Sequence, residues 1–506
     1  MLRREGSRSD LMAPRGRFDL GLAVIGSSHN MPSSKPFAAW IDTNADKLIA
    51  RLKEAVEIPS VSGDASYRPH VHKMGQWLQE QLVQLGAEVK AVPLGKHTLD
   101  GQEVELPPVL LGKYGSDPNK KNILIYGHYD VQPALLSDGW KYEPFTLTDD
   151  KETGRLYGRG SSDDKGPILG WLNVIEAHKA TNTELPVNLV MCFEGMEESG
   201  SEGLEELVIQ EAQNHFKDVD AVCISDNYWL GTESPCLTYG LRGLAYFSVN
   251  ISGPRADLHS GVFGAMVHEP MTDLFALFSK LVTPQGKILI PGINEKVAPL
   301  TDDERKLYEA INVSVADFEN AIGAKTTIYD NKVDCLMGRM RYPSLSIHGI
   351  EGAFSTPGAK TVIPAAVKGK FSIRLVPDLT PDEVNVIVTK YLEEEFAKLN
   401  TKNTLKVEAL HGGKPWIASI DHWNFRAAHK ATETVYGKTP DYTREGGSIP
   451  ITLTFAEALN KNVMLLPMGR GDDGAHSTNE KLDRSNFIQG SQLLGEYLHE
   501  VATAAE

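Results

Sequence analysis

The stretch Ile123-Leu124-Ile125-Tyr126-Gly127-His128-Tyr129-Asp130-Val131 joins an apolar run to a histidine and an aspartate. Residues 122–126, 187–193 and 220–224 are short and largely apolar, and helical patterns over 165–180 and about 203–215 lie between them. Short apolar strands that alternate with helices are typical of a parallel sheet whose two faces are both covered. The sequence therefore predicts an α/β fold built on a mostly parallel sheet.

The pattern changes near Gly240-Leu241-Arg242-Gly243, where residues 244–251 begin to alternate like a strand with one wet face. Beyond this point an insert carries predicted helices at 270–282 and 381–398, predicted strands at 344–348 and 368–375, and a polar, irregular stretch at 284–342. Elsewhere, helices are predicted at 37–56, 70–85, 422–435, 450–458 and 486–501, and strands at 88–92, 109–114 and 463–467. We therefore expect a discontinuous main domain, residues 35–241 and 413–506, interrupted by an α+β domain at residues 242–412.

The bulk composition argues against two classes of partner. The 51 Lys and Arg residues against 67 Asp and Glu give a net charge of −16 with no basic block, so we expect no binding to nucleic acid or anionic membranes. No apolar stretch reaches the roughly 18 residues that a membrane-spanning helix needs. The four cysteines show no CxxC spacing, which is typical of a reduced, intracellular protein, and we expect a cytoplasmic one.

Residues 1–34 have a composition unlike that of the main domain. Five arginines are interrupted by Glu5, Asp10 and Asp19, and the apolar run at 20–26 is too short for the core of a signal peptide. We expect a disordered tail or an extension produced by an upstream start ahead of Met31. A weak transit peptide is the alternative.

Histidines and carboxylates stand where predicted strands end and where one helix begins. They are His128, Glu197, Glu198 and Asp226 after the three apolar runs, His476 after residues 463–467, and Asp163 before the helix at 165–180. Ligands of open α/β sheets bind beyond the carboxyl ends of the strands, and a helix start offers amide donors to a carboxylate. These side chains are therefore expected to converge at one edge of the sheet.

Such a set is suited to two metal ions. Two histidines and three carboxylates suit zinc, or manganese at its harder end. One carboxylate can bridge two ions about 3.5–4 Å apart, an arrangement that polarises a carbonyl and generates hydroxide near neutral pH. A further carboxylate that binds no metal can act as general base, and the adjacent pair Glu197-Glu198 supplies one residue for each task.

Five long motifs make the chain recognisable. They are residues 126–133 (YGHYDVQP), 157–166 (YGRGSSDDKG), 194–203 (EGMEESGSEG), 224–230 (ISDNYWL) and 444–450 (REGGSIP). From about residue 36 to the C-terminus, the chain resembles the aminoacylase and carboxypeptidase superfamily of co-catalytic two-metal peptidases. Within it, the chain is similar to the cytosolic non-specific dipeptidases, relatives of carnosinase whose fungal members are cysteinylglycine metallodipeptidases.

The resemblance implies a role for each candidate ligand. One metal would be bound by His128 and Asp226, the other by Glu198 and His476, and both by the bridging Asp163. Asp130 would orient His128 from behind, and Glu197 would activate the bridging water. The peptide bond Asp163-Asp164 would be cis.

The resemblance also implies that the insert is a lid and dimerisation domain. It would supply His259 from the partner subunit to polarise the substrate carbonyl. The substrate termini would be bound by Thr361, Arg374 and His411 of the lid and by Ser448 of the main domain, with Arg374 forked onto a carboxylate. The expected protein is a homodimeric metallodipeptidase that acts on small peptides such as Cys-Gly, as in glutathione turnover, with two Zn²⁺ or Mn²⁺ ions in each subunit.

Two other functions stay open at this point. The same chemistry would serve an N-acyl amino-acid hydrolase or a carboxypeptidase, against which the motifs of the lid argue. A metal-free, dimeric peptide-binding scaffold would have lost a ligand or replaced Glu197, whereas this chain keeps all of them.

Overall fold

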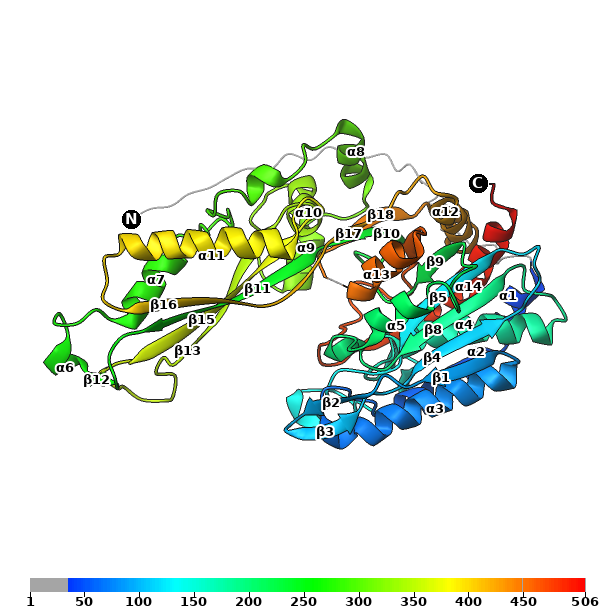
Figure 1. Ribbon diagram of the computed structural model, residues 1–506. Helices are drawn as coiled ribbons and strands as arrows, with labels where there is room; N and C mark the ends of the chain where they lie inside the picture. Colours follow the sequence, from blue (N-terminus) through cyan, green and yellow to red (C-terminus); the bar gives the residue numbers. More distant parts are fainter. Residues whose placement is uncertain (1–34, 448, 506) are drawn as a thin grey trace, which may run out of the picture.

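The chain forms two lobes, each built on its own sheet (Figure 1). The computed structural model describes residues 35–447 and 449–505, so the expectation for residues 1–34 lies outside the described residues. The main lobe holds a nine-stranded sheet and the insert lobe a four-stranded sheet. Strand β10 (Cys236–Leu241) of the main lobe runs almost directly into β11 (Gly243–Ser252) of the insert lobe. These two consecutive strands carry the chain from one lobe to the other.

The centre of the main sheet is parallel, in the order β8 (Asn188–Glu194), β5 (Asn122–His128), β9 (Ala221–Ile224) and β19 (Val463–Leu465). The edges are mixed. Antiparallel pairs add β4 (Val109–Tyr114) and β1 (Glu88–Val92) on one side and β10 with β17 (Trp416–Ile417) on the other, while β18 (Asp441–Glu445) pairs parallel to β10.

The α/β class is thus confirmed, but the sheet is mixed and is parallel only at its centre. A parallel pair needs a crossover of a dozen or more residues, usually a helix. The helices α4 (Lys165–Ala180) and α5 (Leu204–Glu211) supply such crossovers from β5 to β8 and from β8 to β9. Only the short hairpin of β2 (Lys96–Leu99) and β3 (Gln102–Glu105) separates β1 from β4, and this pair is antiparallel.

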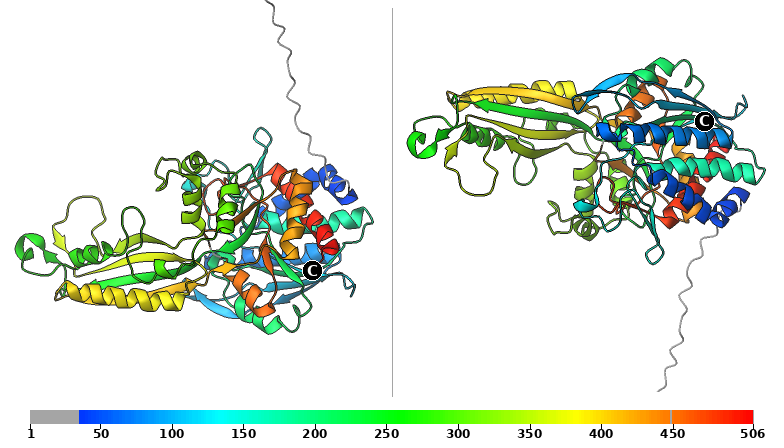
Figure 2. Two further views of the ribbon diagram at one scale, coloured as in Figure 1. Left: turned by 90° about the horizontal axis from the view of Figure 1, so that it is seen from above. Right: turned by 90° about the horizontal axis from the view of Figure 1, so that it is seen from below.

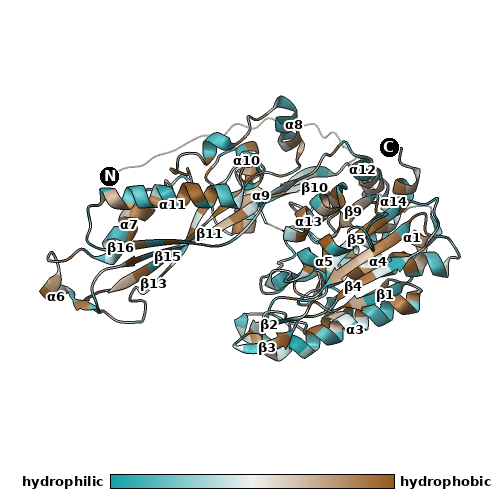
Figure 3. Cartoon of the chain, in the orientation of Figure 1, coloured by the Kyte–Doolittle hydropathy of each residue, from teal (hydrophilic) through white to brown (hydrophobic). Residues whose placement is uncertain are grey.

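The central strands are buried on both faces, as their continuous apolar pattern predicts. In β5, Ile123 and Ile125 point into one core and Leu124 and Tyr126 into another. The first core is covered by α1 (Pro36–Thr43), α2 (Ala45–Val56), α3 (Arg68–Leu85), α4, α12 (Trp423–Tyr436) and α14 (Arg484–Thr503). The second core is covered by α5 and α13 (Pro450–Leu459). Figure 3 shows the apolar colour concentrated on these strands.

The insert lobe is an antiparallel sheet in the order β13 (Ser344–Glu351), β15 (Ala366–Leu375), β11 and β16 (Thr404–Gly413). Helices α7 (Pro270–Phe278) and α11 (Pro381–Lys398) cover one face, on which Phe247 and Phe371 stack 5.0 Å apart. Strand β16 has no counterpart among the predicted strands. At the far end lie β12 (Leu258–His259), α6 (Ser260–Phe263) and β14 (Val362–Ile363), which form the tip of the lobe (Figures 1 and 2).

The prediction of irregular structure at 284–342 is wrong, because three helices lie there: α8 (Asp302–Ala310), α9 (Val315–Ile322) and α10 (Lys332–Met340). Each begins at a side-chain cap, in which Thr301, Ser314 or Asn331 accepts from the amide three residues on. Such caps satisfy amides that a helix start leaves without partners. The α8 and α10 helices contact β18 of the main sheet.

The helix predicted over 37–56 is two helices in the structure, because helical geometry is interrupted at Asn44, between α1 and α2. The Asn44 side chain donates to the Trp40 carbonyl at 2.8 Å, a local bond that competes with helix continuation. A small antiparallel sheet joins β6 (Thr148–Asp150), β7 (Arg155–Tyr157) and β20 (Lys481–Asp483). None of the helices in the described part of the chain has both the length and the apolar character that crossing a bilayer requires.

Candidate active site

The candidate ligands meet at the carboxyl ends of the parallel strands. His128 is the last residue of β5, and Asp226 lies two residues beyond β9. Glu197 and Glu198 start a short 3-10 helix after β8, Asp163 precedes α4, and His476 lies in the loop after β19. The strand ends thus bring together residues that are up to 348 positions apart in the sequence.

Asp163 stands between two groups of side chains. Its Oδ1 atom lies 3.0 Å from His128 Nε2, which is itself 3.7 Å from Asp226 Oδ1. Its Oδ2 atom lies 3.2 Å from His476 Nε2, which is 2.9 Å from Glu198 Oε2. The two oxygens of one carboxylate therefore face two different groups, which is the geometry of a bridging ligand. The peptide bond between Asp163 and Asp164 is cis, as the resemblance implies.

Asp130 contacts both the His128 imidazole and the backbone of the Glu197-Glu198 turn. Its Oδ1 atom is 3.3 Å from His128 Nδ1, the ring nitrogen that points away from Asp163. Both of its oxygens also accept backbone amides, from Glu197 at 3.2 Å and from Glu198 at 3.1 Å. A buried carboxylate in this place fixes the orientation of the imidazole and ties the Glu197-Glu198 turn to it.

The electrostatics of the cluster favour a cation. Burial raises the pKa of the Glu197, Glu198 and Asp226 carboxyls. Hydrogen bonds to Asp163 and Glu198 raise the pKa of His476 to about 10. Crowded, buried carboxylates repel one another when ionised and draw protons or metal ions into the site.

The donor set fits divalent metal ions. Two groups offer ligand atoms that lie within 4.8 Å of one another: His128, Asp164 and Asp226 in one, and Asp163, Glu198 and His476 in the other. Asp164 was not among the predicted ligands. Its Oδ2 atom accepts the backbone amide of His128 at 3.1 Å, whereas Asp163 faces the imidazole itself, so the geometry favours Asp163 as the ligand. His476 is 58% exposed and His128 is fully buried, so the cluster is open to solvent on the His476 side.

A third acidic cluster, Asp472, Asp473 and Asp483, already holds a cation of the chain itself. Lys481 Nζ donates to all three, at 2.7, 2.7 and 2.5 Å. Its ammonium occupies the position that a metal ion would take.

The substrate-binding candidates of the insert lobe form two separate groups. His259 and Thr361 lie together at the tip, where the amide of Ser260 donates to the Thr361 carbonyl at 3.1 Å. Arg374 and His411 lie opposite Leu244 and Tyr246, close to where β11 leaves the main lobe. Most of β11 separates the two groups, a distance on the order of 25 Å at about 3.3 Å per residue. Ser448 lies outside the described residues.

The sequence did not point to Glu480, which is fully buried beside the loop of Asp163. Its carboxylate accepts the backbone amides of Ser162 and Asp163 at 3.0 and 3.1 Å. The only sequence signal is a glutamate four residues after His476, directly before the short strand β20.

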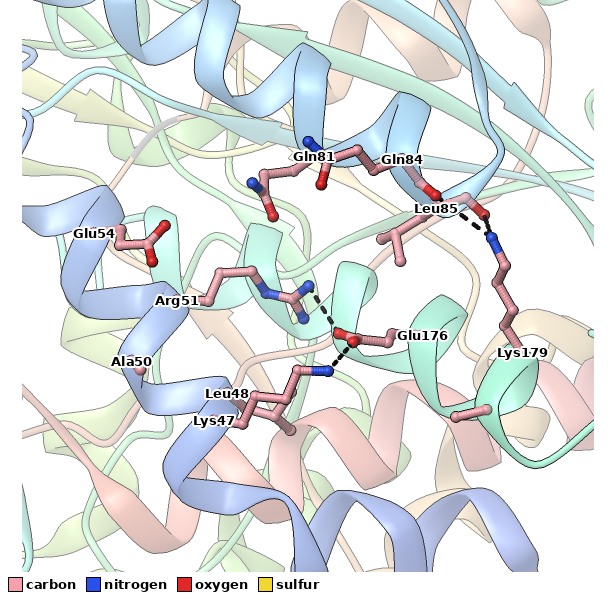
Figure 4. A pocket seen from close by; sticks show the side chains of 11 residues that line it. Lys47, Leu48, Ala50, Arg51, Glu54, Gln81, Gln84, Leu85, Glu176 and Lys179 are labelled. Atoms are coloured by element: carbon pink, nitrogen blue, oxygen red, sulfur yellow. Dashed lines mark hydrogen bonds and ion pairs between the residues drawn. The ribbon is translucent and has the colours of Figure 1, made fainter.

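A separate surface pocket lies between α2, α3 and α4, away from the candidate ligands (Figure 4). Figure 4 shows Lys47 and Arg51 both reaching Glu176, while Lys179 donates to the carbonyls of Gln84 and Leu85. Lys47 and Arg51 thus pair with Glu176 inside this pocket, and none of the described candidate site residues lines it.

A fold and a site of this kind define a metal-dependent hydrolase, and comparison with known proteins supports the same class. The model of peptidase family M20/M25/M40 matches residues 124–500. The chain belongs to this peptidase family. The Cys-Gly metallodipeptidase of Schizosaccharomyces pombe is 56% identical over 465 residues, which cover 92% of this chain and 98% of the relative. The human Beta-Ala-His dipeptidase is 46% identical over 466 residues, 92% of each chain.

The fold has a solved counterpart as well. The structure of the di-peptidase Dug1p from Saccharomyces cerevisiae superposes with a TM-score of 0.85 at 54% identity and covers 93% of this chain and 99% of its own. The expected resemblance to peptidases near the carnosinases and the Cys-Gly metallodipeptidases is therefore confirmed, and so is the expectation of an enzyme that hydrolyses peptide bonds.

Proposed function

We propose that this protein hydrolyses dipeptides, Cys-Gly among them, at a site that holds two divalent ions, Zn²⁺ or Mn²⁺. The observation that carries the proposal is the position of Asp163, whose two oxygens face the His128–Asp226 pair and the His476–Glu198 pair. One carboxylate shared in this way brings two cations close enough to act on one substrate carbonyl.

The residues around the ligands would move the proton. When bound, the metal ions supply Lewis acidity and lower the pKa of water. Glu197 takes up the proton of the attacking water and delivers it to the leaving amine nitrogen. Burial raises the pKa of the Glu197 carboxyl, which makes it a stronger base toward this proton. Asp130 keeps His128 oriented while charge develops at the site.

The inner end of the insert lobe suits a substrate carboxylate. Arg374 on β15 lies near Arg242. Burial together with this neighbour lowers the pKa of Arg242 to about 10, against the opposite effect of the nearby Glu445 carboxylate. Two guanidinium groups close together repel each other and favour an anion between them. We assign this place to the C-terminal carboxylate of the peptide, with His411 and Ser448 as further contacts.

The tip of the insert lobe points to a homodimer in which this lobe, residues 242–412, is both lid and dimerisation domain. His259 and Thr361 lie at the end of the lobe that is remote from the main sheet (Figures 1 and 2). Next to them, Val262 and Met266 are 60% and 73% exposed. Exposed apolar side chains around a histidine favour burial against another chain. His259 would then serve the site of the partner subunit as a donor to the substrate carbonyl.

The choice of Cys-Gly rests on relatives that carry this activity in their names and match 92% of this chain. All four cysteines are free, which supports the cytoplasmic location we propose. The second candidate activity, hydrolysis of N-acyl amino acids or C-terminal residues, would use the same cluster. A panel of Cys-Gly, β-Ala-His and N-acetyl amino acids separates these activities. We expect the free dipeptides to be cleaved at least ten-fold faster, and preferential cleavage of the N-acetyl compounds would contradict the proposal.

The adjacent glutamates are expected to give different phenotypes. Glu197→Gln should retain its metal ions and lose turnover by at least about 10²-fold, the usual scale of a general base. Glu198→Gln should instead lose metal, because its Oε2 lies 2.9 Å from His476 Nε2 among the ligands. Metal content and kcat measured on both variants check this, and reversed phenotypes would exchange the two roles.

A further inference from the structure

Two loops carry Asp163 and His476, and a short strand pair places them side by side. Strand β7 pairs antiparallel with β20, so that Tyr157 faces Lys481. The loop after β7 (residues 158–164) and the loop before β20 (residues 473–480) therefore leave the pair at the same end. Their backbones touch once, where the Gly158 amide donates to the Glu480 carbonyl at 3.0 Å.

Glu480 reaches from the His476 loop into the Asp163 loop. Its Oε1 atom accepts the amides of Ser162 and Asp163, at 3.0 and 3.1 Å. Its Oε2 atom accepts the amide of Gly160 at 3.0 Å and Arg159 Nη1 at 2.8 Å. Four donors are thus fixed by one carboxylate, and one of them belongs to the residue that stands between the two ligand groups.

Arg159 reaches from the Asp163 loop to the His476 loop. Its Nη2 atom donates to the carbonyl of Ser477, the residue after His476, at 3.1 Å. Arg159 is 3% exposed and Glu480 is fully buried. The loop has little freedom to adapt, because Gly160 has a left-handed φ of 84° and an added Cβ would lie 2.6 Å from Val131.

We propose that Glu480 and Arg159 are positioning residues that set the spacing between Asp163 and His476, and with it the affinity of the site for metal ions. The inference rests on the proposed two-metal function. Each residue of the pair sits on one ligand loop and binds the backbone beside the ligand of the other. A shift of either loop would change the 3.2 Å separation of His476 Nε2 and Asp163 Oδ2.

A buried ion pair is weak evidence for stability, because well-packed apolar residues of similar volume are often as stable. An ion pair with a purely structural role would need no hydrogen bonds beyond those between its own two side chains. Here Glu480 makes three further bonds and Arg159 one, all to the backbones of the two ligand loops. Hydrogen bonds distributed in this way hold the two ligand loops at a fixed separation.

The test is Glu480→Gln. A glutamine has one acceptor oxygen, so its NH₂ group must face one of the two pairs of donors. The metal-free protein is titrated with Zn²⁺ against a competing chelator, and hydrogen exchange is followed at the amides of Gly160, Ser162 and Asp163. We expect affinity for at least one ion to fall about 10–100-fold, the usual effect of losing a partner behind a ligand, with faster exchange at these amides.

The matched control is Glu496→Gln, which alters another buried glutamate of the main lobe, paired with Lys35. It should leave both zinc affinities within about two-fold of the unaltered protein. If Glu480→Gln does not fold, Arg159→Met decides, because it keeps the amide bonds of Glu480 and removes the bonds from Arg159 to Glu480 and to the Ser477 carbonyl. A smaller loss, confined to one ion, is expected.

Unchanged affinity for both ions in a folded Glu480→Gln or Arg159→Met protein would overturn the proposal. Equal losses in Glu480→Gln and Glu496→Gln would also overturn it, since the effect would then be general destabilisation. An unaltered protein that binds fewer than two ions would refute the proposed function instead.

Discussion

Asp163→Ala is expected to lose both metal ions and all measurable hydrolysis. The reason is that Asp163 Oδ1 faces His128 and Asp163 Oδ2 faces His476, so one truncation removes a ligand from each ion. It also leaves the two groups of ligands without the negative charge that they share. Metal analysis of the purified variant, beside kcat for Cys-Gly, measures both losses.

The comparison variant for this prediction is His476→Ala. His476 lies near Glu198 and on one side of Asp163 only, so its removal should weaken one ion and leave the other. Two ions per subunit retained in Asp163→Ala would refute the bridging role, whatever the activity of the variant.

His259→Ala is expected to be nearly inactive while keeping its metal ions. A donor about 3 Å from the developing oxyanion is worth roughly 2.7–4 kcal/mol, or about 10²–10³-fold in kcat. The metal ligands lie in the main lobe, whereas His259 lies at the tip of the insert lobe (Figure 1), so the substitution should not disturb them. Zinc affinity and kcat of the variant check the two halves of this prediction.

A mixing experiment identifies the subunit that His259 serves. His259→Ala and Glu197→Gln are each nearly inactive alone and are combined under conditions that let subunits exchange. In a mixed dimer, the site on the His259→Ala subunit has its own Glu197 and receives His259 from its partner, so up to one working site per dimer should appear. If His259 acts within its own subunit, both sites lack one group. Mixed dimers without regained activity would reject the shared site.

The centre of the fold could be predicted because its signals are local. Continuous apolar runs such as residues 122–126 are the pattern of strands buried on both faces, and β5 shows that burial at Ile123 through Tyr126. The helix at 165–180 matches α4 to the residue, since its apolar spacing and its ends agree. The parallel order followed from the helices between strands, whereas antiparallel pairs such as β4–β8 and β10–β19 join strands that are far apart in the sequence.

The helices α8 to α10 were missed because each has only eight or nine residues, so no long apolar stripe marks them. Their signal lay in the caps: Ser314 and Asp317 form a capping box, and Thr301 and Asn331 stand three residues before Glu304 and Asp334. Strand β16 is exposed along most of its length, and its alternation of Leu405, Val407 and Ala409 is short.

The candidate ligands could be found from sequence because each follows a strand or starts a helix. Glu480 and Arg159 could not, since the partners of Glu480 are backbone amides some 320 positions away that carry no sequence signature. Within the chain, the position of His259 relative to the site is set by the length of β11, which the sequence indicates; the proposed dimer would add a contact that no sequence pattern places.

We propose that two metal ions, held by one bridging carboxylate, make this chain a dipeptidase. The most direct measurement follows Cys-Gly hydrolysis while Zn²⁺ or Mn²⁺ is titrated into metal-free protein of known concentration. We expect negligible hydrolysis without metal and a rise that ends at two ions per subunit. Full activity in the metal-free protein, or a plateau at one ion per subunit, would contradict the account.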